Sequence, residues 1–223
     1  MVPVSVSELL IKSTLKKYIL IEFKRIGRLT GSRIKAVMSK VSGGFTESSV
    51  VTKTLLKSLV SSIQKNLTTD EIQYGIDHEH VAIGVLEKYL DANVEECGLF
   101  LHESGILGAS PDGLLPGLAV VEVKCSFKFR QGTSEEAIAY GPYGLYRNQH
   151  GVLMMGENSI YYDQVQLQML CTNLNLCYFV IYIPEQSIIV QVHSNNDWRK
   201  KALKAIDFYE VCILPKLMKS DFC

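Results

Sequence analysis

The sequence lacks an excess of charge of either sign, because 23 lysine and arginine residues are matched by 23 aspartate and glutamate residues. A protein that coats nucleic acid by charge alone is therefore not expected. The sequence also lacks internal repeats, low-complexity tracts and any apolar run near the roughly 20 residues that span a bilayer. With 47% hydrophobic and 21% charged residues over 223 positions, the chain is instead typical of one globular domain.

Cysteine pairs with metal-binding or redox spacing are missing as well. None of the six cysteines belongs to a CxxC pair, and most lie in apolar runs such as "LCYFVIYI", where free cysteine behaves as a small hydrophobic residue. The N-terminus lacks the order of basic region, apolar stretch and small-residue cleavage site that marks a signal peptide. We therefore expect a soluble protein in a reducing, intracellular compartment, without membrane contact.

The balanced total charge hides an uneven distribution along the chain. Residues 1–57 carry eleven basic and three acidic residues, an excess of +8 that the remainder offsets. A basic part beside an acidic part is compatible with a site for a polyanion and a divalent metal. It is equally compatible with chance.

The spacing of apolar residues divides the chain into a helical first part and a mixed second part. Helices are expected at residues 7–23, 30–40, 47–63, 68–92, 159–174 and 196–220. Strands are expected at residues 97–104, 105–113 and 118–127, as one meander, and at 176–184 and 187–194, as a second pair. Between these groups, residues 131–158 predict a long irregular loop of the kind that often carries function. This order predicts an α/β fold with a central mixed β-sheet flanked by helices.

Two short segments of the middle region carry residues suited to chemistry. "SPDG" at 110–113 is by itself a good turn, and "VEVKC" at 121–125 is by itself a strand with one polar face. The pair is more informative, because residues two apart in a strand point to the same face. Glu122 and Lys124 are therefore expected to project together, while the valines and the cysteine of the strand face the core.

The short connection "GLLPGL" is expected to return Asp112, at the end of the preceding strand, to the side of Glu122 and Lys124. Two carboxylates at one point supply the hard oxygen ligands that Mg²⁺ or Mn²⁺ prefers. An ammonium group beside them can orient a water molecule or help deprotonate it. Together these groups are the equipment for metal-assisted hydrolysis of a phosphodiester bond.

This pattern is the PD-(D/E)xK nuclease signature, and four blocks around it sharpen the comparison. In chain order they are "RIGRLTGS" (25–32), "YGIDHEHVA" (74–82), "LGASPDGLL…VVEVKC" (107–125) and "YYDQVQLQM" (161–169). Each block is weak alone, but four in order at sensible spacings are specific. The sequence resembles the lambda exonuclease and YqaJ viral recombinase family over residues 25 to about 180.

The resemblance implies a restriction-endonuclease-like fold and a role for each matching residue. The implied ligands of Mg²⁺, or of Mn²⁺ in its place, are Asp112, Glu122, the backbone carbonyl of Val123 and, as an outer or second-metal carboxylate, Glu79. Lys124 is implied to position the attacking water, and Gln164 to orient the lysine or the nucleophile. Arg25 and Ser32 match the pocket for a terminal 5′-phosphate, for which a guanidinium group is well suited.

Other interpretations of these residues are kept open. A zinc pair of His78 and His80 is disfavoured, because side chains two apart on a helix diverge. Arg25 is also compatible with an ordinary surface cation, and at least one of Gln164, Gln166 and Gln168 is expected to be merely exposed. Tyr161 and Tyr162 are expected to serve packing rather than base stacking. Lys128 and Arg130, just past the strand, are candidates for phosphate contacts.

The sequence-based hypothesis is one nuclease domain over residues 1–223, with a helical, basic part at 1–68. Its expected activity is metal-dependent 5′-to-3′ exonuclease digestion of linear double-stranded DNA, in recombination or mobile-element processing. The alternatives are a catalytically inactive DNA-binding or assembly module of the same fold and a structure-selective endonuclease. By family analogy, the expected partners besides DNA are further copies of the chain, as a trimer, and a single-strand annealing protein.

Overall fold

The computed structural model describes residues 26–41, 43–46, 49–60 and 69–219, apart from the side chain of Ser32. Within them, a four-stranded sheet has the order β3 (Gly113–Leu115), β4 (Ala119–Cys125), β7 (Leu176–Tyr182), β8 (Ile188–His193). Strand β4 pairs antiparallel with β3 and parallel with β7, and β7 pairs antiparallel with β8. The predicted mixed central sheet is therefore confirmed.

The two central strands are covered by helices on both faces. Their sequences, AVVEVKC and LCYFVIY, are the near-continuous apolar runs expected of strands buried on both sides. Helix α4 (Asp70–Leu90) covers one face, where Ala82 and Leu86 join a core with Val121 and Val123. Helix α6 (Tyr162–Thr172) covers the other face and belongs to the crossover that parallel neighbours require.

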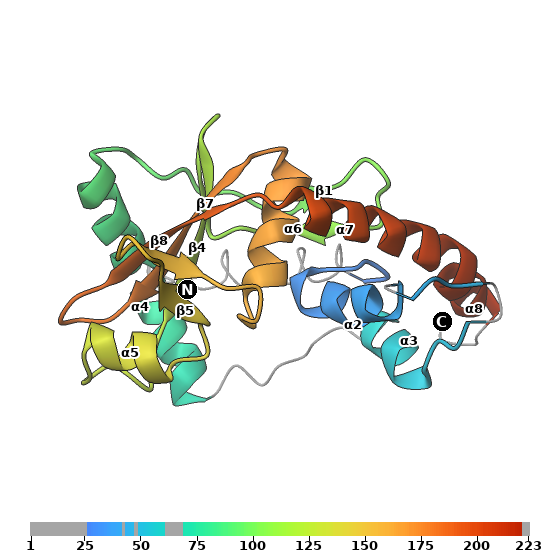
Figure 1. Ribbon diagram of the computed structural model, residues 1–223, viewed down its shortest axis with the longest axis horizontal. Coiled ribbons are helices and arrows are strands. Elements are labelled where there is room, and N and C mark those ends of the chain that lie inside the picture. Colours follow the sequence, from blue (N-terminus) through green and yellow to red (C-terminus); the bar gives the residue numbers. More distant parts are fainter. Residues whose placement is uncertain (1–25, 42, 47–48, 61–68, 220–223) are drawn as a thin grey trace, which may run out of the picture.

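A group of further helices extends the molecule to one side of the sheet (Figure 1). Helix α2 (Gly31–Val41) packs against α6, α3 (Lys53–Val60) and α7 (Asn196–Phe208), so that α6 stands between the sheet and this helical region. A larger hydrophobic core runs from the α6 face of the sheet into the helical region without interruption. No helix among the described residues combines the length and apolar character that a membrane crossing needs.

Most of the predicted helices are present, with two shorter or interrupted. Helix α4 begins after Thr69, whose side chain accepts a hydrogen bond from the Ile72 amide, so Thr69 rather than Thr68 is the cap. Of the helix expected at 47–63, the described residues contain α3; residues 49–52 are not helical, and Leu55 N–H donates to the Thr52 hydroxyl in the manner of a cap. The expected helix at 7–23 lies outside the described residues.

The C-terminal helix expected at 196–220 is interrupted by a π-helical turn. Helix α7 passes into this turn, η1 (Tyr209–Ile213), and then into α8 (Leu214–Lys219). The Leu214 amide bonds the carbonyl of Tyr209, five residues back. Pro215 follows at once and has no N–H to continue the ordinary ladder, so the irregular turn lies where the α-helical hydrogen bonds are broken anyway.

Two predictions about the middle region are wrong. The three strands expected as one meander are divided, because β1 (Phe100–Leu101) and β2 (Gly108–Ala109) form a separate two-stranded sheet. The loop expected at 131–158 contains α5 (Ser134–Tyr140) and a hairpin of β5 (Leu145–Arg147) and β6 (Leu153–Met155). Helix α5 begins with a capping box of Thr133 and Glu136, a four-residue signal that the sequence displays.

Candidate active site

Strand β4 presents its two polar side chains to α6. Val121 and Val123 lie in the core beneath α4, whereas Glu122, alternate to them, is 1% exposed and is bonded by side chains of α6. Lys124 points to the same face as Glu122, and its ammonium group contacts Glu122 Oε1. The expected alternation along this strand is therefore confirmed, and it delivers a buried carboxylate and an ammonium group side by side.

Asp112 is fixed next to the same stretch of β4 by two hydrogen bonds. Its amide donates to the carbonyl of Val121 at 3.0 Å, and its Oδ2 accepts from the amide of Val123 at 2.7 Å. Asp112 stands one residue before β3 rather than at the end of a strand, which corrects the sequence-based expectation. Because a strand residue directs its N–H and C=O to the same side, the Val123 carbonyl also points to the side of Asp112.

The carboxylate of Glu122 receives three hydrogen-bond donors. Lys124 Nζ and Gln164 Nε2 both donate to Oε1, the latter at 2.5 Å, and Gln168 Nε2 donates to Oε2 at 2.5 Å. An ionised carboxylate has about four lone-pair positions. One position, on Oε2, is therefore left for a further partner.

Helix α6 supplies both amide groups because residues four apart share a helix face. Gln166 points elsewhere, donating to the His193 carbonyl at 2.9 Å and accepting from the Asn195 amide at 2.8 Å. The expectation that one of the three glutamines is merely exposed is wrong, because Gln166 and Gln168 are each 1% exposed and Gln164 is half-buried. Gln168 was not selected from the sequence, although its spacing of four from Gln164 placed it on the same face.

The electrostatics of the site reflect several carboxylates around one ammonium group. Burial, the charge of Glu122 and, more weakly, that of Glu79 raise the pKa of Asp112 well above its ordinary value, although Lys124 opposes the shift. Burial alone would lower the pKa of Lys124, but the carboxylates of Glu122 and Asp112 outweigh it and raise that pKa. Glu79, on α4, is therefore within electrostatic reach of Asp112.

The first turn of α2 lies against α6 at Gln164. A Cβ atom on Gly31 would stand 2.9 Å from Cγ and 3.3 Å from Cα of Gln164, so only glycine permits this approach. Ser32 is the next residue of α2, which places its backbone close to Gln164, and its side chain is not described. Arg25 lies outside the described residues.

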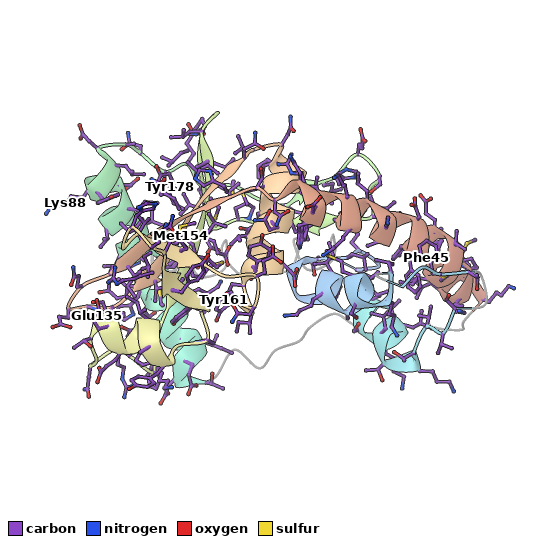
Figure 2. All side chains as sticks on the ribbon, viewed as in Figure 1. Phe45, Lys88, Glu135, Met154, Tyr161 and Tyr178 are labelled. Carbon is purple, nitrogen blue, oxygen red and sulfur yellow. The ribbon has the colours of Figure 1, made fainter. Side chains whose placement is uncertain are left out.

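Aromatic rings line the approach to Lys124. Its Nζ lies 5.2 Å from the centre of the Tyr161 ring, which stacks on Tyr143 and tilts against Phe179. Figure 2 shows Tyr161 between the β5–β6 hairpin and α6. The expected packing role of Tyr161 is thus confirmed. His78, for its part, stacks on Tyr74 with ring centres 3.9 Å apart.

Comparisons with known proteins agree with the family resemblance seen in the sequence. The model of the YqaJ-like viral recombinase domain matches residues 22–175. The alkaline nuclease of Autographa californica nuclear polyhedrosis virus is 28% identical over 148 residues, which cover 58% of this chain and 35% of that protein. The chain therefore spans about a third of the length of this relative.

Solved structures share the fold. An alkaline exonuclease (LHK-Exo) from Laribacter hongkongensis has a TM-score of 0.62 at 22% identity, covering 87% of this chain and 89% of that one. A further structure of that exonuclease is a complex with dAMP. A phage related exonuclease from Haemophilus somnus 129PT has a TM-score of 0.53 at 13% identity, covering 81% and 90%.

Proposed function

Because this chain belongs to the YqaJ-like viral recombinase domain family, we propose that it is a metal-dependent nuclease that hydrolyses phosphodiester bonds of DNA. The observation that carries the proposal is the convergence of three charged groups at β4, where Glu122 and Lys124 share one face and Asp112 is bonded to the backbone of the same strand, with Gln164 and Gln168 bonded to the buried carboxylate. Burying a carboxylate with one ammonium and two amide donors costs free energy, and such an arrangement is unusual in a purely structural core.

The donor set fits a hard divalent cation. Among the described residues, no three His, Cys, Asp or Glu side chains are already gathered as a metal cage. The ligands here would instead be Asp112, the remaining lone pair of Glu122 and the Val123 carbonyl, all oxygen atoms, with Glu79 as an outer carboxylate. Such a set suits Mg²⁺, or Mn²⁺ in its place. When bound, the cation would supply Lewis-acid stabilisation of charge developing on the phosphate.

The other residues of the site position the water molecule and the Glu122 carboxylate. The Lys124 ammonium group aligns a water molecule with the phosphorus, and its contact with the Tyr161 ring limits the directions in which it can swing. Gln164 and Gln168 hold the Glu122 carboxylate in one orientation, so that it need not reorganise during the reaction. The side chains thus contribute mainly positioning and fixed charge, which is what phosphoryl transfer requires of a protein.

Replacing Gln168 by leucine tests the positioning of Glu122. Among the described residues Gln168 is the donor to Oε2, so Gln168→Leu removes that bond, and we expect about 10- to 100-fold weaker binding of Mn²⁺, as for other residues that orient metal ligands. Isothermal titration of EDTA-stripped protein with Mn²⁺ measures it. The matched control is Gln166→Leu, on the same helix, which loses the bonds to His193 and Asn195 and should lower stability but keep the wild-type affinity. Equal affinity in both variants would contradict the role of Gln168.

We propose that the substrate is linear double-stranded DNA, entered from a 5′-phosphorylated end, with Arg25 and Ser32 at the terminal phosphate. Support comes from the first turn of α2, which contains Ser32 and lies against Gln164. Helix N-termini favour anions through their unpaired N–H groups and dipole. The solved relatives described as exonucleases support digestion from an end, and the dAMP complex of one of them supports mononucleotide products.

Digestion of end-labelled duplexes in Mg²⁺ tests this function. We expect wild type to degrade linear DNA with a 5′-phosphate about tenfold or more faster than DNA with a 5′-hydroxyl, and Arg25→Ala to lose that preference while still cutting. Closed circular DNA should resist. Cutting of circles would favour the structure-selective endonuclease, and folded protein that binds but never cuts in Mg²⁺ or Mn²⁺ would favour the inactive binding module. Trimer formation and an annealing partner belong to the same proposal, in a recombination setting.

A further inference from the structure

The chain leaves β4 through a loop that forms one wall of a groove. Residues 126–132 turn away from the strand, and Glu136 and Tyr140 of α5 complete the lining of an open hollow of about 600 Å³. We call this space the β4–α5 groove and define its polar lining by Lys128, Arg130, Glu136 and Tyr140. A volume of this order accommodates one or two nucleotide-sized groups.

Two cations of the groove are pre-positioned and not paired with acids. The Arg130 guanidinium group lies 3.8 Å from the centre of the Phe127 ring and donates to the Phe127 carbonyl at 2.7 Å, while remaining exposed. Lys128 Nζ lies 4.9 Å from the centre of the Phe129 ring. Within the part of the chain that the structure describes, neither cation forms a salt bridge. Cations held over aromatic rings lose little entropy when an anion binds.

Glu136, the acidic side chain in the lining of the groove, already has a hydrogen-bond partner. Glu136 Oε2 accepts from the amide of Thr133 at 2.9 Å as part of the α5 capping box. Its charge lies close to the first turn of a helix, where it is partly compensated. The groove therefore retains a cationic character from Lys128 and Arg130.

The groove begins a few residues along the chain from the proposed site of hydrolysis. Lys128 follows Lys124 by four residues, so their Cα atoms are at most about 13–14 Å apart even in a fully extended chain. Tyr140 is 74% exposed, and exposed aromatic rings in cationic grooves stack with the bases of single strands. Phosphates on the two cations and a base on the tyrosine would lie within a few nucleotides of Glu122.

From these observations we propose that the β4–α5 groove binds one unpaired strand of nucleic acid, with backbone phosphates on Lys128 and Arg130 and a base against Tyr140. The inference rests on the proposed nuclease function for its substrate class. It adds a contact between Tyr140 and a base, which a strand offers to the face of an aromatic ring only where its bases are unpaired. The loop 126–132 thus connects the nucleic-acid contacts of the groove to β4, the β-strand that carries Glu122 and Lys124.

Equilibrium binding of a fluorescent single-stranded oligonucleotide in EDTA tests the groove without any cleavage. The double variant Lys128→Gln/Arg130→Gln should bind at least about tenfold more weakly, and the slope of log K against log salt should fall by about 1.4, or 0.7 for each lost phosphate contact. The matched control is Lys201→Gln/Lys204→Gln, which removes two exposed cations from α7. It should change neither quantity.

A second pair of measurements isolates the tyrosine. Tyr140→Ala should weaken binding about five- to tenfold, Tyr140→Phe should not, and neither change should affect an abasic strand of the same length. Wild-type affinity and slope in the double variant would overturn the proposal, as would equal losses in the α7 control. The nuclease assay gives a separate result. If wild type cuts DNA but the groove variants bind the oligonucleotide as tightly as wild type, the groove proposal alone is refuted. If the groove variants bind more weakly but wild type does not cut DNA, the nuclease function alone is refuted.

Discussion

Replacing Asp112 by asparagine is expected to abolish cleavage while making the metal-free protein more stable. Asp112→Asn removes a proposed metal ligand, and we expect activity to fall about 10³-fold or more. The raised pKa of Asp112 means that its ionised form opposes folding. Asparagine lacks that charge, and its Oδ1 can still accept the Val123 amide. We expect Tm in EDTA at pH 7.5 to rise by about 2–4 °C, the effect of about 1 kcal/mol in a domain of this size.

The pH dependence of the stability of the metal-free protein tests whether ionised Asp112 opposes folding. A carboxyl group whose pKa is raised on folding contributes stability below its unfolded pKa, about 3.9, and loses it as pH rises through the folded value. The stability gap between Asp112→Asn and wild type should therefore widen from pH 4 upward and close at lower pH. Adding Mg²⁺ should raise the Tm of wild type only. A variant that is less stable than wild type at pH 7.5 in EDTA would contradict the electrostatic account.

Replacing Lys124 by alanine is expected to abolish cleavage with the opposite effect on stability. The change removes the ammonium group that contacts Glu122 and leaves two carboxylates without their cation. Removing one member of a buried pair is strongly destabilising. Because Lys124 is 23% exposed, we expect a moderate loss of about 1–3 kcal/mol, seen as a lower Tm, together with an activity loss of about 10²–10³-fold.

The control for Lys124→Ala is Lys201→Ala, which removes an exposed cation of α7 and should leave Tm and activity unchanged. Taken with Asp112→Asn, the pair separates two explanations of lost activity. Misfolding would lower Tm in both variants, whereas the proposed charge balance moves Tm in opposite directions. Wild-type cleavage by Lys124→Ala would remove this lysine from the mechanism.

The residues of β4 were accessible from sequence because their arrangement is local. Alternation along a strand places Glu122 and Lys124 on one face whatever the rest of the chain does. The second amide, Gln168, was not selected, because its value depends on how α6 is rotated against the sheet. That rotation is set by packing of residues such as Val165 and Leu167 in the core, and a single sequence does not reveal it.

The errors in the fold have two physical origins. The strands β1 and β2 were assigned to the central sheet because strand-forming composition does not specify the partner, and pairing is decided by long-range contacts. The prediction of a loop at 131–158 is wrong although the sequence contains local signals for a helix and a hairpin. Thr133 and Glu136 form a capping box, and Asn148 Oδ1 accepts two amides in the turn between β5 and β6. These cap and turn residues are the local signals that indicate both elements.

The pairing of β4 has a consequence for when the site comes into being. Its antiparallel partner β3 is adjacent in the chain, but its parallel partner begins much later, with Val120 opposite Cys177, 57 positions further on. Pairings between distant segments lose the entropy of loop closure before their contacts form, and they therefore form late in folding. A nascent chain that ends before β7 thus contains Asp112, Glu122, Lys124 and both glutamines yet exposes β4 as an open edge. The proposed site is complete only when β7 closes that edge.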